Sequence, residues 1–213
     1  MSSSKGVSDE VLERVFELSD FDASYILLMA TAGILSAVAL LTNSIPVLIG
    51  SMVIAPAFAP LALVSLAVVN RRSDLAWEGF VTAVLGLSIA MSAALVVTWF
   101  LTTARVLPPE AELLNKTLLQ ERVSPGWYSV VTAIAAGIAG IIALTERKVD
   151  TLVGVVAALA LVPAGVAGAI AFLSEDPIRG WGGIALLGIN VALIVVSGIL
   201  TLLFFQPDEQ ENG

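Results

Sequence analysis

Charged side chains divide the chain into long apolar stretches. No Asp, Glu, Lys or Arg occurs in the five stretches 23–70, 79–104, 123–145, 151–174 and 180–207. A helix that crosses a bilayer needs about 20 mostly apolar residues. Four stretches therefore fit one membrane helix each, and the first is long enough for two. Continuous runs of this length disfavour β-strands, because barrel strands alternate in polarity and are only about 10 residues long.

The first stretch divides at a short polar break, where Asn43 or Ser44 can cap a helix start and Pro46 fits the first turn that follows. The pattern therefore predicts an all-α integral membrane protein with six transmembrane helices. The predicted spans are 25–42, 46–69, 76–103, 127–145, 151–173 and 180–205.

Polar segments border this six-span membrane domain, which is predicted at 24–205. Residues 1–23 form an acidic lead-in helix, which either lies on the membrane surface or packs on its own protein. The packed arrangement is favoured, because basic residues that would bind anionic lipid are nearly absent there. A polar loop at 104–126 carries a second short helix, and 206–213 forms an acidic tail.

The two halves of the membrane domain, 24–103 and 127–205, resemble each other. A shift of 104 residues places Ala32-Gly33-Ile34 on Ala136-Gly137-Ile138, and both halves carry proline in their second span. Because each half has three spans, the second half must enter the membrane with the opposite orientation. The sequence therefore predicts an inverted repeat of two three-helix halves, a layout common in secondary transporters.

Prolines interrupt the second and fifth predicted spans. Proline has no N–H, so Pro56 leaves the carbonyl of Met52 without its helical bond, and Pro163 does the same for Leu159. A carbonyl without a partner is costly in hydrocarbon. We therefore expect proline-broken second and fifth helices whose carbonyls face protein, water or an ion. The alternative is a simple kink satisfied by a neighbouring Ser or Thr.

Three motifs carry a resemblance to a known family. Residues 43–60 combine Asn-Ser, Ile-Gly-Ser-Met and a Pro-x-x-x-Pro ending at Pro60, and Ala160-Leu161-Val162-Pro163 and 182–190 follow later. These motifs resemble those of the hydrophobic membrane proteins called domain of unknown function 389 (DUF 389), over roughly 24–205. The resemblance implies a prokaryotic multi-pass membrane protein and implies no activity.

Composition excludes several classes of function. With 58% apolar and 13% charged residues, the chain is too apolar for a soluble globular enzyme. It has neither Cys nor His, so thiolate metal sites, cysteine nucleophiles and the usual general base are absent. The net charge of −8 disfavours a nucleic-acid partner. We expect no enzymatic activity, no cofactor and no metal site.

Neutral polar and proline residues supply the candidate site. Asn190 falls near the middle of the last span, where it either contacts a solute or makes an interhelical hydrogen bond. Glu78, one turn into the third span, is the deepest charged residue and fits the membrane interface. The predicted cavity or pathway is lined by Asn43, Ser44, Met52, Pro56, Pro60, Pro163 and Asn190.

Two functions remain open. The first is a small-solute or ion transporter or channel; the second is a non-transporting structural or regulatory membrane protein. The lipid bilayer is the expected partner, and small residues four apart, as at Ala32/Ser36, allow a homo-oligomer. A weak excess of basic residues in one set of loops predicts a cell membrane protein with both termini in the cytoplasm. That cytoplasmic set is Lys5, Arg14, Arg71, Arg72, Arg147 and Lys148, against Arg105, Lys116, Arg122 and Arg179 outside.

Overall fold

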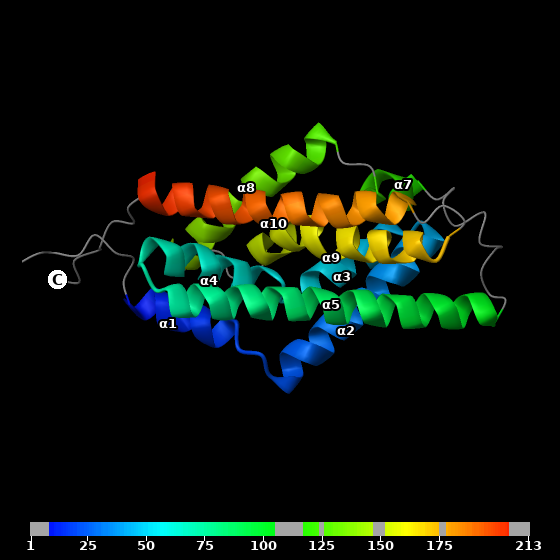
Figure 1. The fold of residues 1–213 in the computed structure, drawn as a ribbon, viewed down its shortest axis with the longest axis horizontal. Helices are drawn as coiled ribbons and strands as arrows, with labels where there is room; N and C mark the ends of the chain where they lie inside the picture. Colours follow the sequence, from blue (N-terminus) through cyan, green and yellow to red (C-terminus); the bar gives the residue numbers. More distant parts are fainter. Residues whose placement is uncertain (1–8, 105–116, 124–125, 147–151, 175–177, 205–213) are drawn as a thin grey trace, which may run out of the picture.

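The computed structural model describes residues 9–104, 117–123, 126–146, 152–174 and 178–204, and within these ranges every regular element is an α-helix. The helices are α1 (Asp9–Leu18), α2 (Ala23–Thr42), α3 (Ile45–Ile54), α4 (Phe58–Val69), α5 (Ser73–Thr103), α7 (Thr117–Val123), α8 (Trp127–Glu146), α9 (Leu152–Phe172) and α10 (Ile178–Phe204) (Figure 1). The predicted all-α class is confirmed.

Four helices, α2, α5, α8 and α10, are long and apolar enough to cross a membrane. The pair α3 and α4 forms a fifth candidate, bent by 48° at a short break. These helices indicate a membrane protein. The fifth predicted span, 151–173, corresponds to α9, whose apolar segment Leu161–Phe172 is shorter than a membrane span. The count of six spans therefore stays a prediction.

The two longest helices lie lengthwise on either side of the central helices. In Figure 1, α5 and α10 run along opposite sides and in opposite directions, with α3, α4 and α9 between them. Helix α2 packs on α5, and α8 packs on α10. Helix α9 contacts α2, α3, α5, α8 and α10, and its side chains from 161 to 171 are all buried. The centre of the bundle is thus closely packed.

Glycines set the distance between the paired helices. A Cβ atom added at Gly33 in α2 would overlap the backbone of Ala90 in α5. A Cβ atom at Gly137 in α8 would lie 2.6 Å from the carbonyl oxygen of Ile194 in α10. Small residues allow the helices to approach closely. The resulting van der Waals contacts stabilise the bundle, because lipid gives no hydrophobic driving force for helix association.

The second predicted span is broken, as expected, and each of its prolines has a distinct position. Ala55 is extended (φ −71°, ψ 117°), the conformation favoured before a proline such as Pro56, and it ends α3. Pro60 lies in the first turn of α4, where a backbone N–H has no intrahelical partner. One proline therefore stops a helix, and the other is placed where it costs little.

The expected break in the fifth span is wrong. Helix α9 continues through Pro163 from Leu152 to Phe172. A single interior proline removes one backbone hydrogen bond, and the turns on either side keep theirs. The second span differs in its backbone, because Ala55 before Pro56 is extended, whereas Val162 before Pro163 stays helical within the closely packed α9.

The two short helices pack on the bundle. Helix α1 contacts α4 and α8, buries Leu12 and Val15, and donates a hydrogen bond from Arg14 to the carbonyl of Leu144. This agrees with a lead-in helix packed on its own protein. Helix α7 lies within the predicted polar loop and contacts α2, α9 and α10. The predicted tail at 206–213 lies outside the described residues.

Candidate functional site

Two of the predicted site residues lie where α2 meets α3. Asn43 follows α2 in the left-handed conformation (φ 55°), and its exposed side chain accepts a hydrogen bond from the backbone N–H of Leu118 (3.1 Å). Ser44 precedes α3 and is half-buried. Asn43 therefore joins α2 to α7, a role that the sequence pattern did not predict.

The remaining predicted residues lie further inside. Met52 and Asn190 are 1% and 2% exposed, Pro60 and Pro163 are buried, and Pro56 is half-buried at the helix break. They come from α3, α4, α9 and α10, and α9 contacts each of the other three helices. The residues predicted from the sequence thus lie on helices that meet at the centre of the bundle. That these side chains line a solute pathway stays a prediction.

Buried hydroxyl groups bridge the helices near the break. The Oγ atoms of Ser36 and Ser51 are 2.8 Å apart and join α2 to α3, and Ser51 also donates to the carbonyl of Leu48. Ser65 in α4 bonds the carbonyl of Leu61 (3.1 Å) and lies 3.3 Å from that of Val195 in α10. Ser65 was not predicted from the sequence, although a hydroxyl five residues after Pro60 in an otherwise apolar run was a signal for it.

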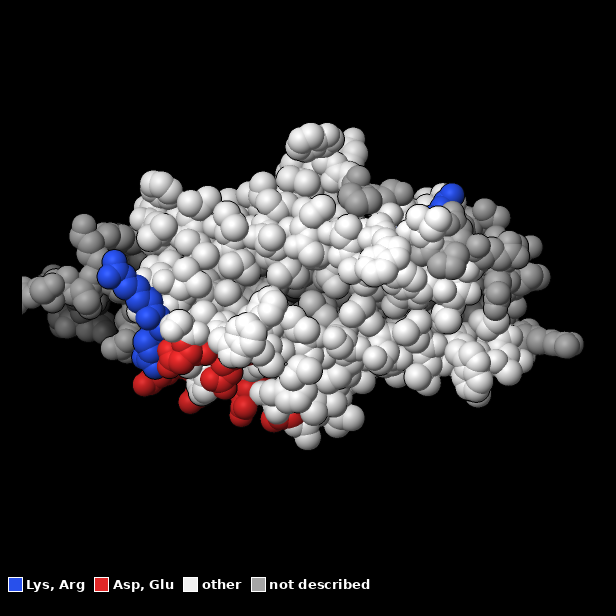
Figure 2. Space-filling view, viewed as in Figure 1, with Lys and Arg blue, Asp and Glu red and all other residues white. Residues whose placement is uncertain are grey.

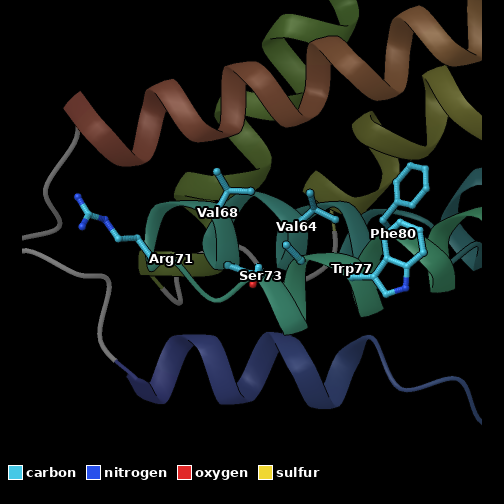
Figure 3. A pocket seen from close by; sticks show the side chains of 8 residues that line it. Val64, Val68, Arg71, Ser73, Trp77 and Phe80 are labelled. Carbon is cyan, nitrogen blue, oxygen red and sulfur yellow. The ribbon is translucent and has the colours of Figure 1, made fainter.

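An open groove lies on the outer surface between α4 and α5. It has a volume of about 620 Å³ and is lined by none of the predicted site residues. Figure 3 shows Arg71 at one end of the groove, Trp77 and Phe80 at the other, and Val64 and Val68 between them. The full lining is Val64, Ala67, Val68, Arg71, Ser73, Ala76, Trp77 and Phe80. The sequence pattern alone could not reveal this groove, because the groove forms only where α4 and α5 lie side by side.

Charges gather at the end of the molecule where α5 begins. Figure 2 shows most of the acidic and basic side chains of this face there. Arg72 contacts Asp74 at 3.4 Å, and both side chains are more than half exposed, so this ion pair adds little stability. Within the described ranges, no group of three or more carboxylates could hold a metal ion.

The long apolar helices and the charged end together indicate a multi-pass membrane protein. Comparison with known proteins identifies the family of the chain. The family described as Domain of unknown function (DUF389) matches residues 52–196, and the chain belongs to this family.

A curated relative of the chain is itself uncharacterised. The chain is 22% identical over 157 residues to an uncharacterised protein of Methanocaldococcus jannaschii, a match that covers 74% of this chain and 46% of the relative. The chain thus spans about half the length of that protein. No solved structure matches the chain.

Proposed function

We propose that the chain is a six-span membrane protein, built from two inverted halves, that moves a small solute or ion across the membrane. The observation that carries the proposal is the 104-residue shift between the halves. Shifted by 104, α2 covers 127–146, the bounds of α8, and α10 falls on 74–100, inside α5. Helix α9 falls on 48–68, over α3 and α4.

Close contacts between helices support the same shift. Gly33 lies against the backbone of Ala90, and positions 33 and 90 become 137 and 194 after the shift. Gly137 indeed lies against the backbone of Ile194. An accidental match in an apolar sequence would not be expected to reproduce such contacts.

A second pair of contacts agrees. An added Cβ at Gly79 would lie 2.7 Å from the carbonyl oxygen of Pro60, and one at Gly183 would lie 3.2 Å from that of Ala164. The buried face of α5 also recurs on α10. Of the eight buried α5 residues, Leu87 shifts onto the half-buried Val191, and the other seven shift onto buried residues. These seven are Gly79, Thr82, Ala83, Gly86, Ala90, Ala94 and Thr98, which shift onto Gly183, Leu186, Leu187, Asn190, Ile194, Gly198 and Leu202.

The short helices extend the repeat beyond the halves defined by the membrane spans. Val15 and Ser19, buried in and after α1, shift onto the buried residues Leu119 and Val123 of α7. Helix α1 packs on α4 and α8, and α7 packs on α9 and α2. Each short helix therefore packs mainly on its own half and also contacts the first long helix of the other half.

The opposed directions of α5 and α10 support an inverted arrangement (Figure 1). Trp77 and Trp99 lie 22 residues apart on α5, and both are about two-thirds exposed. At 1.5 Å per residue they are about 33 Å apart. This matches a hydrocarbon core of about 30 Å bordered by two aromatic belts. The two-fold axis would then lie in the membrane plane.

Transport is proposed because inverted-repeat transporters bind their solute near the midplane, at helix breaks between the halves. Here the broken span formed by α3 and α4 also carries the buried hydroxyls of Ser51 and Ser65, each of which donates to a carbonyl of its own helix. None of the seven predicted pathway residues is charged. We therefore expect a neutral solute or a weakly held ion, with the described state closed to solvent.

The second candidate is a structural or regulatory protein that transports nothing. The observation in its favour is the tight centre, because every side chain of α9 from 161 to 171 is buried. Such a bundle would keep its interior dry in all states.

Thiol labelling of single-cysteine variants separates the two candidates, since the chain has no native cysteine. We would introduce Met52→Cys and Asn190→Cys, with Val53→Cys as the matched lipid-facing control and Ser73→Cys as the exposed control. Transport predicts that in permeabilised cells a membrane-impermeant reagent labels positions 52 and 190 and leaves 53 unlabelled. If 52 and 190 stay unlabelled in folded protein while 73 reacts, the non-transporting function replaces transport.

A further inference from the structure

The groove between α4 and α5 has a counterpart in the second half, and the two differ in a way that points to a ligand. This comparison uses the proposed 104-residue repeat and does not depend on transport. The shift places Val68 on Phe172, Ala76 on Gly180 and Trp77 on Trp181.

In the second half the chain fills this space itself. The ring of Phe172 packs edge to face on Trp181, with ring centroids 5.5 Å apart. It also lies over Gly180, where an added Cβ would come within 2.7 Å of the ring. In the first half the smaller Val68 leaves a groove of about 620 Å³ beside Trp77. The groove in the first half is lined mainly by apolar side chains, so we expect its occupant to be apolar too.

The charged residues that precede α5 in the sequence differ from those at the shifted positions. Arg71 and Arg72 precede α5, whereas the sequence has Glu175 and Asp176 at the shifted positions, which lie outside the described residues. Among the described residues that line the groove, only Arg71 is charged. An occupant of the first groove should therefore carry an anionic group next to its apolar part.

The backbone holds Arg71 at this position despite strain. Helix α4 ends in a Schellman motif, with hydrogen bonds from Arg71 N to the carbonyl of Val68 (3.2 Å) and from Arg72 N to that of Ala67 (2.8 Å). Arg71 occupies the left-handed position (φ 56°), which usually holds glycine or asparagine. A strained arginine at the mouth of a groove is a reason to look for a functional contact.

We infer that the α4–α5 groove binds one anionic phospholipid, with its phosphate on the Arg71 guanidinium and an acyl chain along Val64, Val68 and Trp77. Arginine binds phosphate oxygens through a planar fork of donors. Trp77 is 67% exposed on a span that begins at Ser73, the depth at which tryptophans border the hydrocarbon. The head group would thus lie at the interface and the chain below it.

The test is quenching of Trp77 by brominated lipid in phosphatidylcholine nanodiscs. Small, equal fractions of bromo-phosphatidylglycerol or bromo-phosphatidylcholine are added, and the Trp77 signal is the difference between the full chain and its Trp77→Phe variant. We expect about fivefold preferential quenching of Trp77 by the anionic lipid, the effect of one basic residue at an anionic lipid surface. Trp181, isolated in the same way, should show no preference. Equal quenching of Trp77 by both lipids overturns the inference.

Two variants identify the groove as the source. Arg71→Asn introduces a residue that tolerates the left-handed turn, so it should remove the preference for the anionic lipid without lowering the unfolding temperature. Arg72→Gln changes the arginine that pairs with Asp74, and it should keep the preference. Val68→Phe copies the second half and should reduce quenching of Trp77 by both lipids. Retained preference in Arg71→Asn contradicts the site. Unchanged quenching of Trp77 in Val68→Phe would mean that no acyl chain lies in the groove, and would also overturn the inference.

Discussion

At the scale of single residues, small side chains decide how the helices meet. Gly33 and Gly137 each touch the backbone of the neighbouring helix, while Gly188 in α10 has no atom within 4 Å of an added Cβ. Glycine in an open helical position costs about 0.5–1 kcal/mol relative to alanine. Glycine is therefore needed for helix packing at positions 33 and 137, and it slightly lowers the stability of the helix at position 188.

This contrast gives a stability prediction. Gly33→Ala and Gly137→Ala should each destabilise the protein by about 1–3 kcal/mol, because the helices must move apart. Gly188→Ala should be neutral or slightly stabilising, since it meets nothing and favours the helix. Thermal unfolding in detergent measures all three. Equal effects at the three positions would mean that helix propensity, and not helix contact, sets the stability.

At the scale of elements, Pro56 has a different task from Pro60. Pro56 holds Ala55 extended, whereas Pro60 lies in a first turn that needs no N–H. Pro56→Ala should therefore let α3 and α4 straighten, and Pro60→Ala should leave the 48° bend unchanged. Spin labels at positions 49 and 68, both exposed, report the distance between the two helices. A longer distance in Pro60→Ala alone would contradict this assignment.

Helix α1 gives a second prediction at this scale. Val15 is fully buried beneath α1, whereas Phe16 beside it is 38% exposed. Val15→Asp should detach α1, because burying an unpaired carboxylate costs several kcal/mol. Trypsin should then cleave after Arg14 at least about tenfold faster, since that cost exceeds the 1.4 kcal/mol per factor of ten. Phe16→Asp is the control and should leave cleavage slow.

The elements also show what could be predicted from the sequence. Charge-free runs and the polar break at Asn43 gave helices α2, α5, α8 and α10 close to their observed bounds, because each long helix must keep charges out of hydrocarbon. The pattern failed at Pro163, since whether a proline breaks a helix depends on the residues packed around it. It also missed the groove beside Trp77, which exists only where α4 and α5 lie side by side.

At the scale of the whole molecule, the account depends on the halves being inverted. Helices α5 and α10 begin at opposite ends of the bundle (Figure 1), so Arg72 and Arg179, at their starts, should lie on opposite sides of the membrane. With six spans and both termini in the cytoplasm, Arg72 lies inside and Arg179 outside. If α9 did not cross the membrane, these two residues would lie on the same side.

Sidedness of these two positions is therefore the most direct test. Arg72→Cys and Arg179→Cys, each the only cysteine in the chain, are exposed in intact cells and in permeabilised cells to a membrane-impermeant maleimide. The account predicts that Arg179→Cys reacts in intact cells and that Arg72→Cys reacts only after permeabilisation. Labelling of both variants from the same side would contradict the six-span inverted repeat.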